Sequence, residues 1–176
     1  LLDSEQGKTS LETRKLFASQ AFHVSSHYDA EIFGFFDQDQ KSALKVSVAD
    51  SKKLRYGENP HQEGYYYGNL DELFEQLHGK EISYNNLLDI DAAVGLINEF
   101  DETTFAIMKH NNACGLATRE NLVDAWKDAL AGDPVSAFGG VLICNRNIDP
   151  DTAEEMNKIT GIVVLHDGKG GLEKFI

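Results

Sequence analysis

Three short apolar segments in the second half of the chain, separated by two helix-forming segments, most constrain how it can fold. Nearly unbroken apolar runs of this length are typical of strands that are covered on both faces. They occupy residues 104–108 (TFAIM), 141–144 (VLIC) and 162–165 (IVVL), with helix signals over 119–131 and 149–159 between them. The order strand, helix, strand, helix, strand predicts an α/β layer with right-handed crossovers and mainly parallel strand pairing.

These two helices have end signals of their own. Thr118 is placed to cap the first helix and Gly132 to end it. Asp149 is placed to cap the second helix, with Pro150 at its first helical position.

The first half of the chain predicts further helices and strands around one shaped loop. Thr9 and Glu12 have the spacing of a capping box, and apolar residues recur at helical spacing after Asn69. Leu44, Val46 and Val48 alternate with polar residues, as in a half-buried strand. We expect helices over 10–24, 28–36, 70–77 and 89–100, a polar linker over 37–41, strands over 44–48 and 65–67, and a loop over 53–62.

Charge and composition exclude several classes of function. A formal net charge of −13 would repel a phosphate-rich polymer, which argues against general nucleic-acid binding. No apolar run approaches the roughly 20 residues that a membrane span needs. Cys114 and Cys144 form no CxxC pair, which favours a reducing cytoplasmic setting over a disulfide framework. His23 and His27 lack the acidic partner of an HExxH site, so we interpret them as ordinary helix histidines.

Two polar segments contain side chains that can carry chemistry. The segment 109–115 (KHNNACG) begins where the first apolar strand ends, and ligands collect at the carboxyl ends of strands in open α/β sheets. It offers a cation, Lys109, a group that titrates near neutrality, His110, an amide, Asn111, and Gly115, at which backbone can approach a ligand closely. Spacing alone leaves a plain polar turn as the alternative.

The segment 55–62 (RYGENPHQ) provides Arg55, which can bind a phosphate with two parallel hydrogen bonds, and Tyr56, which can stack or donate. A solvated surface turn is its alternative. The segment 133–140 (DPVSAFGG) has a glycine pair, including Gly139, suited either to tight packing or to phosphate approach, and tight packing is the favoured interpretation.

Four motifs in this order, RYGENPHQ, YNNLLDIDAA (84–93), KHNNACG and DPVSAFGG, resemble those of the AICAR transformylase/IMP cyclohydrolase family. The upstream segment 9–32 is similar to the helices that close the cyclohydrolase domain of that family. The resemblance covers roughly residues 8–158, after which we find no further match. Because residue 1 is Leu and no signal peptide is recognisable, the chain looks like a piece of a longer protein.

The resemblance implies a cytidine deaminase-like, three-layer α/β lobe with a mixed, mainly parallel sheet, preceded by a helical linker segment. Residues 1–42 would close the cyclohydrolase domain, and residues 43–176 would form the first of two transformylase lobes. Zinc deaminases hold their metal with HxE and PCxxC motifs. The PCxxC motif does not occur in this sequence, so no metal is expected. Family members are cytoplasmic homodimers with active sites across the interface.

The reaction implied is transfer of a formyl group from the co-substrate 10-formyltetrahydrofolate to the 5-amino group of AICAR, in the synthesis of IMP. By the family pattern, His110 matches the proton-transfer residue and Lys109 the adjacent essential cation. Arg55 and Tyr56 match residues that hold the nucleotide, with Asn111 and Gly139 as weaker candidates. Ala113 stands where many bacterial members have proline.

Without the second lobe, which holds much of the folate site, we expect the piece alone to be inactive. The alternative function is a non-catalytic module that binds a purine ribotide or serves dimerisation.

Overall fold

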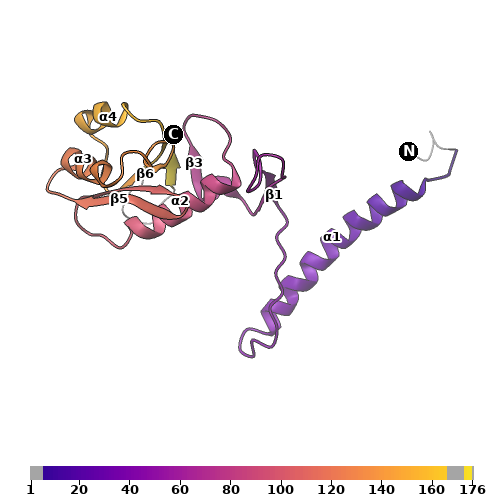
Figure 1. Cartoon of the computed structure of the whole chain (residues 1–176). Coiled ribbons are helices and arrows are strands. Elements are labelled where there is room, and N and C mark those ends of the chain that lie inside the picture. The colour runs from indigo at the N-terminus through magenta and orange to yellow at the C-terminus, as the bar shows by residue number, and fades with distance from the viewer. Residues whose placement is uncertain (1–5, 166–172, 176) are drawn as a thin grey trace. The chain divides into compact units, whose positions relative to one another are not determined.

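The computed structural model describes residues 6–165 and 173–175. The chain forms two compact units, Leu1–Ser51 and Lys52–Ile176 (Figure 1). No helix in the described ranges is long and apolar enough to cross a lipid bilayer.

The first unit is one long helix, α1 (Leu11–Phe36), followed by an extended segment. The helix is continuous where the sequence predicts two, and Ser10 caps it by accepting a hydrogen bond from the Thr13 backbone N–H. None of its 26 residues is buried. The predicted strand over 44–48 is wrong, since residues 41–50 form no regular element and Val46 is 73% exposed. An alternating pattern produces a strand only where a neighbouring strand is available for pairing.

The second unit contains a six-stranded sheet in the order β3-β8-β7-β6-β4-β5 and a small two-stranded sheet of β1 and β2. The elements are β1 (Ser51–Lys53), β2 (Tyr65–Tyr67), the 3-10 turn η1 (Leu70–Glu72), β3 (Phe74–Gln76), α2 (Tyr84–Ile97), β4 (Thr104–Lys109), β5 (Asn112–Thr118), α3 (Leu122–Gly132), β6 (Val141–Cys144), α4 (Pro150–Met156), β7 (Ile162–Leu165) and β8 (Glu173–Phe175).

The sheet is mixed, as predicted, but it is not mainly parallel. Two of its five strand pairs are parallel and three are antiparallel. Two of the three antiparallel pairs, β4 with β5 and β4 with β6, follow from β5, a strand that the sequence pattern does not predict. A two-residue turn joins it to β4, and such a short connection can only join antiparallel strands.

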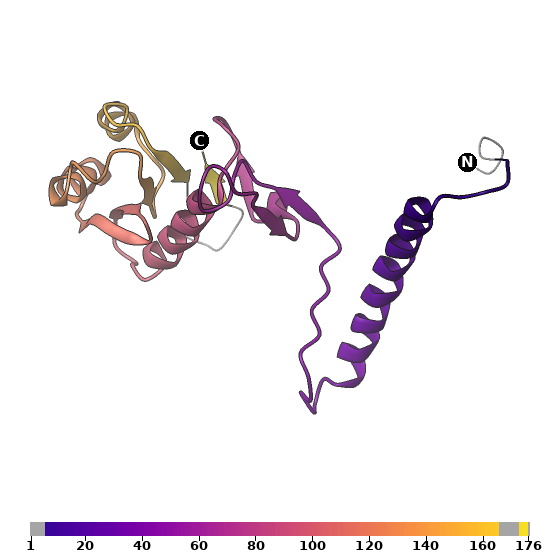
Figure 2. The same ribbon diagram turned by 45° about the vertical axis from the view of Figure 1, so that its right-hand side comes forward.

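Helices cover both faces of the large sheet, which gives three layers (Figure 2). Alternate residues of β4 serve the two faces: Phe105 and Ile107 join a core with α3 and α4, while Ala106 and Met108 join a core with α2. Phe105 packs edge-on against Trp126 of α3 at a ring-centroid distance of 5.0 Å. The apolar run TFAIM is therefore a strand buried on both sides, as predicted.

Several predicted helices differ from those observed. The predicted helix over 70–77 is wrong, because η1 and β3 occupy that segment and β3 pairs with β8. Helix α2 begins at Tyr84, five residues before the predicted start, because Ser83 and Asn86 form a reciprocal cap. Helix α3 begins at Leu122 rather than near Arg119.

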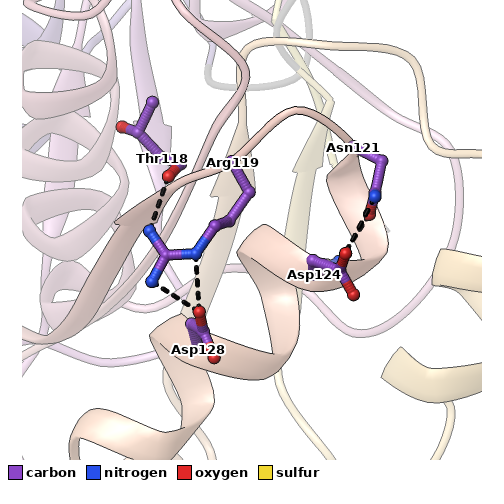
Figure 3. Close-up of polar contacts among 5 residues, drawn as sticks. All are labelled: Thr118, Arg119, Asn121, Asp124 and Asp128. Carbon is purple, nitrogen blue, oxygen red and sulfur yellow. Dashed lines mark hydrogen bonds and ion pairs between the residues drawn. The ribbon is translucent and has the colours of Figure 1, made fainter.

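The start of α3 is fixed by side chains on either side of it. Asn121 caps the helix by accepting a hydrogen bond of 2.9 Å from the Asp124 N–H. Arg119 precedes the cap and reaches the Asp128 carboxylate at 2.6 Å through its Nε, while its terminal nitrogen donates to the Thr118 carbonyl (Figure 3). The predicted cap, Thr118, instead ends β5.

Candidate active site

The turn between β4 and β5 has an uncommon backbone conformation. His110 and Asn111 form its two central residues, flanked by the paired residues Lys109 and Asn112. The φ angles of His110 and Asn111 are +53° and +60°. Positive φ at both central residues defines a type I′ turn, which matches the twist of a hairpin but usually recruits Asn and Gly. A histidine is therefore held in a left-handed conformation at the tip of the hairpin.

An irregularity in β5 follows directly after this turn. Ile107 pairs with Gly115 and Met108 pairs with Ala113, so Cys114 is an extra residue on β5. Such bulges redirect side chains and occur often beside active sites. The turn and the bulge border a cavity of about 430 Å³. Its lining comes from β4, β5 and the loop before β6 and consists of Lys109, His110, Asn112, Ala113, Cys114, Asp133 and Ser136.

Lys109 connects this cavity to the loop 133–140. Its ammonium donates a hydrogen bond of 2.8 Å to the Phe138 carbonyl oxygen. Hydrogen bonds from Ser136 lower the pKa of the Asp133 carboxyl below its ordinary value, with a smaller effect from the Lys109 charge. Partial burial, and then the Asp133 charge, raises the pKa of the Cys114 thiol. The cavity thus holds a cation beside a carboxylate, with a neutral thiol and an exposed imidazole.

A second cavity has a volume of about 540 Å³. Its lining includes Gly139, the residue that follows Phe138 in the loop 133–140. Gly139 has a φ of +74°, and its N–H donates a 2.7 Å hydrogen bond to the Thr160 carbonyl. The lining combines cationic side chains with backbone-rich turns: Arg55, His78, Gly79, Lys80, Glu81, Ile82, Asn86, Gly139, Thr160, Gly161 and Ile162. Arg55 and Lys80 give this lining two cations against the one carboxylate of Glu81, and this excess of positive charge suits an anionic group such as a phosphate.

The loop that carries Arg55 is built by backbone hydrogen bonds. Gly57 N–H donates to the Gln62 carbonyl at 2.8 Å, and Arg55 N–H donates to the Ile82 carbonyl at 3.1 Å. The Arg55 guanidinium lies 5.0 Å from the centroid of the half-buried Tyr56 ring, in cation–π geometry. The predicted shaped loop is therefore confirmed.

Helix α2 contacts two of the other motifs, the segment 55–62 and the segment 109–115. At its first residue, the Tyr84 N–H donates to the Tyr56 carbonyl at 3.1 Å, and the Asn85 amide donates to the Glu58 carbonyl at 2.9 Å. One turn further along, the Asp89 carboxylate accepts a 2.7 Å hydrogen bond from the Asn111 backbone N–H. Together with the bond from Lys109 to Phe138, these contacts connect all four sequence motifs.

The structure distributes the predicted site residues over two cavities. Lys109 and His110 line one, and Arg55 and Gly139 line the other. Tyr56 stacks under Arg55 instead of lining either cavity. Asn111 faces α2, because its amide, oriented so that both polar atoms are satisfied, donates to the Leu88 carbonyl at 3.1 Å.

The sequence predicts that the backbone at Gly115 lets a ligand approach closely. The structure gives this glycine a packing role instead. A Cβ at this position would lie 1.8 Å from the Ala129 carbonyl oxygen, so the glycine permits close packing of α3 on β5.

Sequence reasoning missed His78, Lys80 and Asp89. Asp89 had a recognisable signal, because it stands four residues before Ala93 and eight before Ile97, on the buried face of α2. A carboxylate on such a face needs a hydrogen-bonding partner. In the described parts of the chain, no group of three or more His, Cys, Asp or Glu side chains is arranged to hold a metal ion.

The arrangement places two cations, Arg55 and Lys80, at one cavity, and an imidazole next to the Lys109 ammonium at the other. A sequence model of the AICARFT/IMPCHase bienzyme family matches residues 1–168. The chain belongs to this family. The match continues past residue 158, where the resemblance of the motifs ended.

Bacterial proteins named bifunctional purine biosynthesis protein PurH are similar to this chain over most of its length. The one from Bacteroides thetaiotaomicron is 64% identical over 162 residues, which cover 92% of this chain and 32% of the relative. The one from Persephonella marina is 46% identical over 168 residues, covering 88% and 33%. The one from Caldicellulosiruptor saccharolyticus is 44% identical over 175 residues, covering 92% and 34%. The chain thus spans about a third of the length of these members of the bienzyme family.

Proposed function

We propose that this chain carries the proton-transferring groups and part of the nucleotide site of AICAR formyltransferase (phosphoribosylaminoimidazolecarboxamide formyltransferase). The observation that carries the proposal is the set of contacts among the four motifs. Tyr84 bonds to Tyr56, Asp89 to Asn111, and Lys109 to Phe138. Segments far apart in the sequence are thereby held around two cavities whose side chains suit a phosphorylated substrate and a proton transfer.

Arg55 is the proposed partner of the ribotide phosphate. Its guanidinium is exposed, lines the larger cavity, and is supported by the Tyr56 ring beneath it. Lys80 adds a second cation to the same lining, and the Gly139 backbone leaves open space where a side chain would otherwise stand. These features favour an anionic ligand despite the chain's net charge of −13.

The proposed reaction begins with attack of the AICAR 5-amino nitrogen on the formyl carbon of 10-formyltetrahydrofolate. This amine is a weak nucleophile, because its lone pair is delocalised into the imidazole ring. His110 accepts the proton that the amine loses as the new C–N bond forms. The bond between the formyl carbon and N10 then breaks, and the imidazolium returns the proton to N10.

Lys109 stabilises the negative charge that develops on the formyl oxygen. An ammonium has three N–H donors, and the Phe138 carbonyl uses one of them. The same group can therefore fix the loop 133–140 and donate to a substrate oxygen.

The rest of the proposal follows family membership. Residues 43–176 form the first lobe of a cytidine deaminase-like transformylase domain, and residues 1–42, which include α1, close the cyclohydrolase domain. The active enzyme is a cytoplasmic homodimer that needs no metal. This chain alone is inactive, because the second lobe supplies most of the folate site.

The test uses a hybrid enzyme, in which this chain replaces the matching third of the Bacteroides thetaiotaomicron relative. His110→Ala is expected to lower kcat for formyl transfer by about 100- to 10,000-fold, the usual contribution of a positioned general base. Lys158→Ala is the control, since Lys158 pairs on the surface with Glu155. Normal transfer by the His110→Ala hybrid would refute the catalytic assignment.

Calorimetric titration with AICAR separates catalysis from binding. Arg55→Ala is expected to weaken AICAR binding by about 10- to 100-fold, the loss of one charge-assisted contact. Arg119→Ala is the matched control, because Arg119 pairs with Asp128 outside both cavities. Binding that depends on Arg55, with transfer that does not depend on His110, would favour a non-catalytic ribotide-binding module. Binding unaffected by Arg55→Ala would remove the nucleotide site from this loop.

A further inference from the structure

Asp89 is a charged side chain in an unusual place. It lies on the core-facing side of α2, in line with Ala93 and Ile97, and is only 8% exposed. Its Oδ1 accepts the 2.7 Å hydrogen bond from the Asn111 backbone N–H. The Asn111 amide, in its satisfied orientation, donates to the same oxygen at 3.2 Å. Burying a carboxylate is costly, and this one is directed at a single turn.

The turn it contacts needs external support. Neither His110 nor Asn111 is a glycine, yet both have a left-handed backbone conformation. The left-handed conformation is unfavourable for non-glycine residues, and it persists where surrounding contacts over-determine it. Asn and His occur in this conformation more often than other non-glycine residues, but it is uncommon for both. Within the turn, the Asn112 amide donates to the His110 carbonyl at 2.8 Å. The bond from Asp89 connects the turn to the core of the unit.

We propose that Asp89 is a positioning residue for formyl transfer, which holds the His110–Asn111 turn in its left-handed conformation so that the imidazole is directed at the substrate amine. The inference rests on the function proposed above. Asp89 itself lines neither cavity, so it acts through the turn and not by touching the substrate. Its removal therefore affects kcat more than AICAR binding, because Arg55 and the larger cavity do not depend on this hydrogen bond.

The experiment compares Asp89→Ala with Asp89→Asn in the hybrid enzyme. Asparagine keeps an oxygen at the same position that can accept the Asn111 N–H, while alanine does not. We expect Asp89→Ala to lower kcat by about 10- to 100-fold, the effect of misplacing a catalytic group by roughly an ångström, with KM for AICAR within about threefold. Asp89→Asn should recover kcat to within about threefold of the parent hybrid.

Asp91 provides a matched control, because it is an exposed carboxylate two residues away on the same helix. Asp91→Ala and Asp91→Asn are expected to leave kcat and KM unchanged. If only Asp89→Ala lowers kcat, the cause is the lost hydrogen bond to the Asn111 N–H. It is then not a general effect of removing negative charge from α2.

Several results would overturn the inference. They are an unchanged kcat in Asp89→Ala, an equal loss in Asp89→Asn and Asp89→Ala, or a loss expressed in KM alone. If His110→Ala were also fully active, the proposed function itself would fail. If His110→Ala were inactive while Asp89→Ala were normal, only the positioning role would fail.

Hydrogen exchange in the unaltered hybrid keeps the inference testable if Asp89→Ala does not fold. The Asn111 amide should exchange slowly, because the buried Asp89 carboxylate accepts its hydrogen bond. Exchange of this amide at the rate of an unstructured peptide would show that Asp89 does not hold the turn.

Discussion

The ammonium of Lys109, at the end of β4, lies 2.8 Å from the Phe138 carbonyl oxygen in the loop before β6. One side chain thereby provides the cation of the smaller cavity and fixes the segment that borders the larger one. Removing it should disturb both cavities at once.

Lys109→Met tests this double contribution, because methionine has a similar length without charge or N–H donors. In the hybrid enzyme we expect kcat/KM for formyl transfer to fall by at least about 100-fold, the cost of losing one charge-stabilising donor. We also expect amide hydrogens in 136–139 to exchange faster, measured by mass spectrometry. Lys158→Met is the control. Transfer within threefold of the parent, or unchanged exchange in the loop, would contradict the respective half of the prediction.

Gly115→Ala should destabilise the second unit. The new Cβ would lie 1.8 Å from the Ala129 carbonyl oxygen, so β5 and α3 must separate. We expect the free energy of unfolding to fall by about 3 kcal/mol, at the upper end of overpacking costs. This loss of free energy can be measured by urea unfolding, with the fluorescence of Trp126, the chain's one tryptophan, as the signal.

Gly95→Ala is the matched control for this substitution. Gly95 lies within α2, and a Cβ added there would meet no atom within 4 Å outside its own stretch of helix. Alanine should therefore stabilise the unit by about 0.5 to 1 kcal/mol. A destabilisation of the same size in both variants would show that the Gly115 contact does not limit packing.

Because the thiol of Cys144 is buried, we expect the folded protein to lose stability at high pH. Burial raises the pKa of its thiol from 9.0 to about 11. Between these values the folded state holds the proton that the unfolded state has lost, so the stabilisation is complete below pH 9 and declines as the pH rises toward 11. Raising the pH from 8 to 10.5 should therefore lower the free energy of unfolding by about 2 kcal/mol through this group.

The Cys144→Ala variant isolates that contribution. Its cavity lowers stability at every pH, whereas the pH-dependent part should be smaller than in the parent by about 2 kcal/mol over the same interval. Parallel pH profiles for the two proteins, measured by urea unfolding, would show that the thiol does not titrate as its burial implies.

Local sequence patterns predict the buried centre of the second unit well. The strands β4, β6 and β7 are short apolar runs, and a strand covered on both faces needs little more than such a run. Helix α4 is predicted through its Asp149 cap and Pro150. Both signals act within a few residues, so tertiary contacts seldom override them.

Patterns fail where pairing with a distant segment decides the structure. The apolar spacing after Asn69 fits a helix, but β3 pairs with β8, about a hundred residues along the chain. Strand β5 carries Gly115 and Cys114 in place of a regular alternation, so only its hairpin connection to β4 identifies it. That connection depends on a left-handed turn at His110, a conformation that a histidine in the sequence does not indicate.

The candidate site is predictable as residues but not as an arrangement. The motifs identify Lys109, His110 and Arg55, and the structure places them around two cavities. The contacts through α2, from Tyr84 to Tyr56 and from Asp89 to Asn111, join segments that no local spacing relates. A buried carboxylate on an apolar helix face is the one available indication of these links.

The alternation of β4 between two cores limits which changes in chain length this family can accept. Deleting one residue between Phe105 and Met108 would send each following side chain to the opposite face. Met108 would move into the core of Phe105 and Trp126, and Lys109 would turn away from Phe138. Insertions and deletions should therefore accumulate in connections such as 98–103, while the strand that ends at Lys109, in the proposed catalytic pair with His110, keeps a constant length.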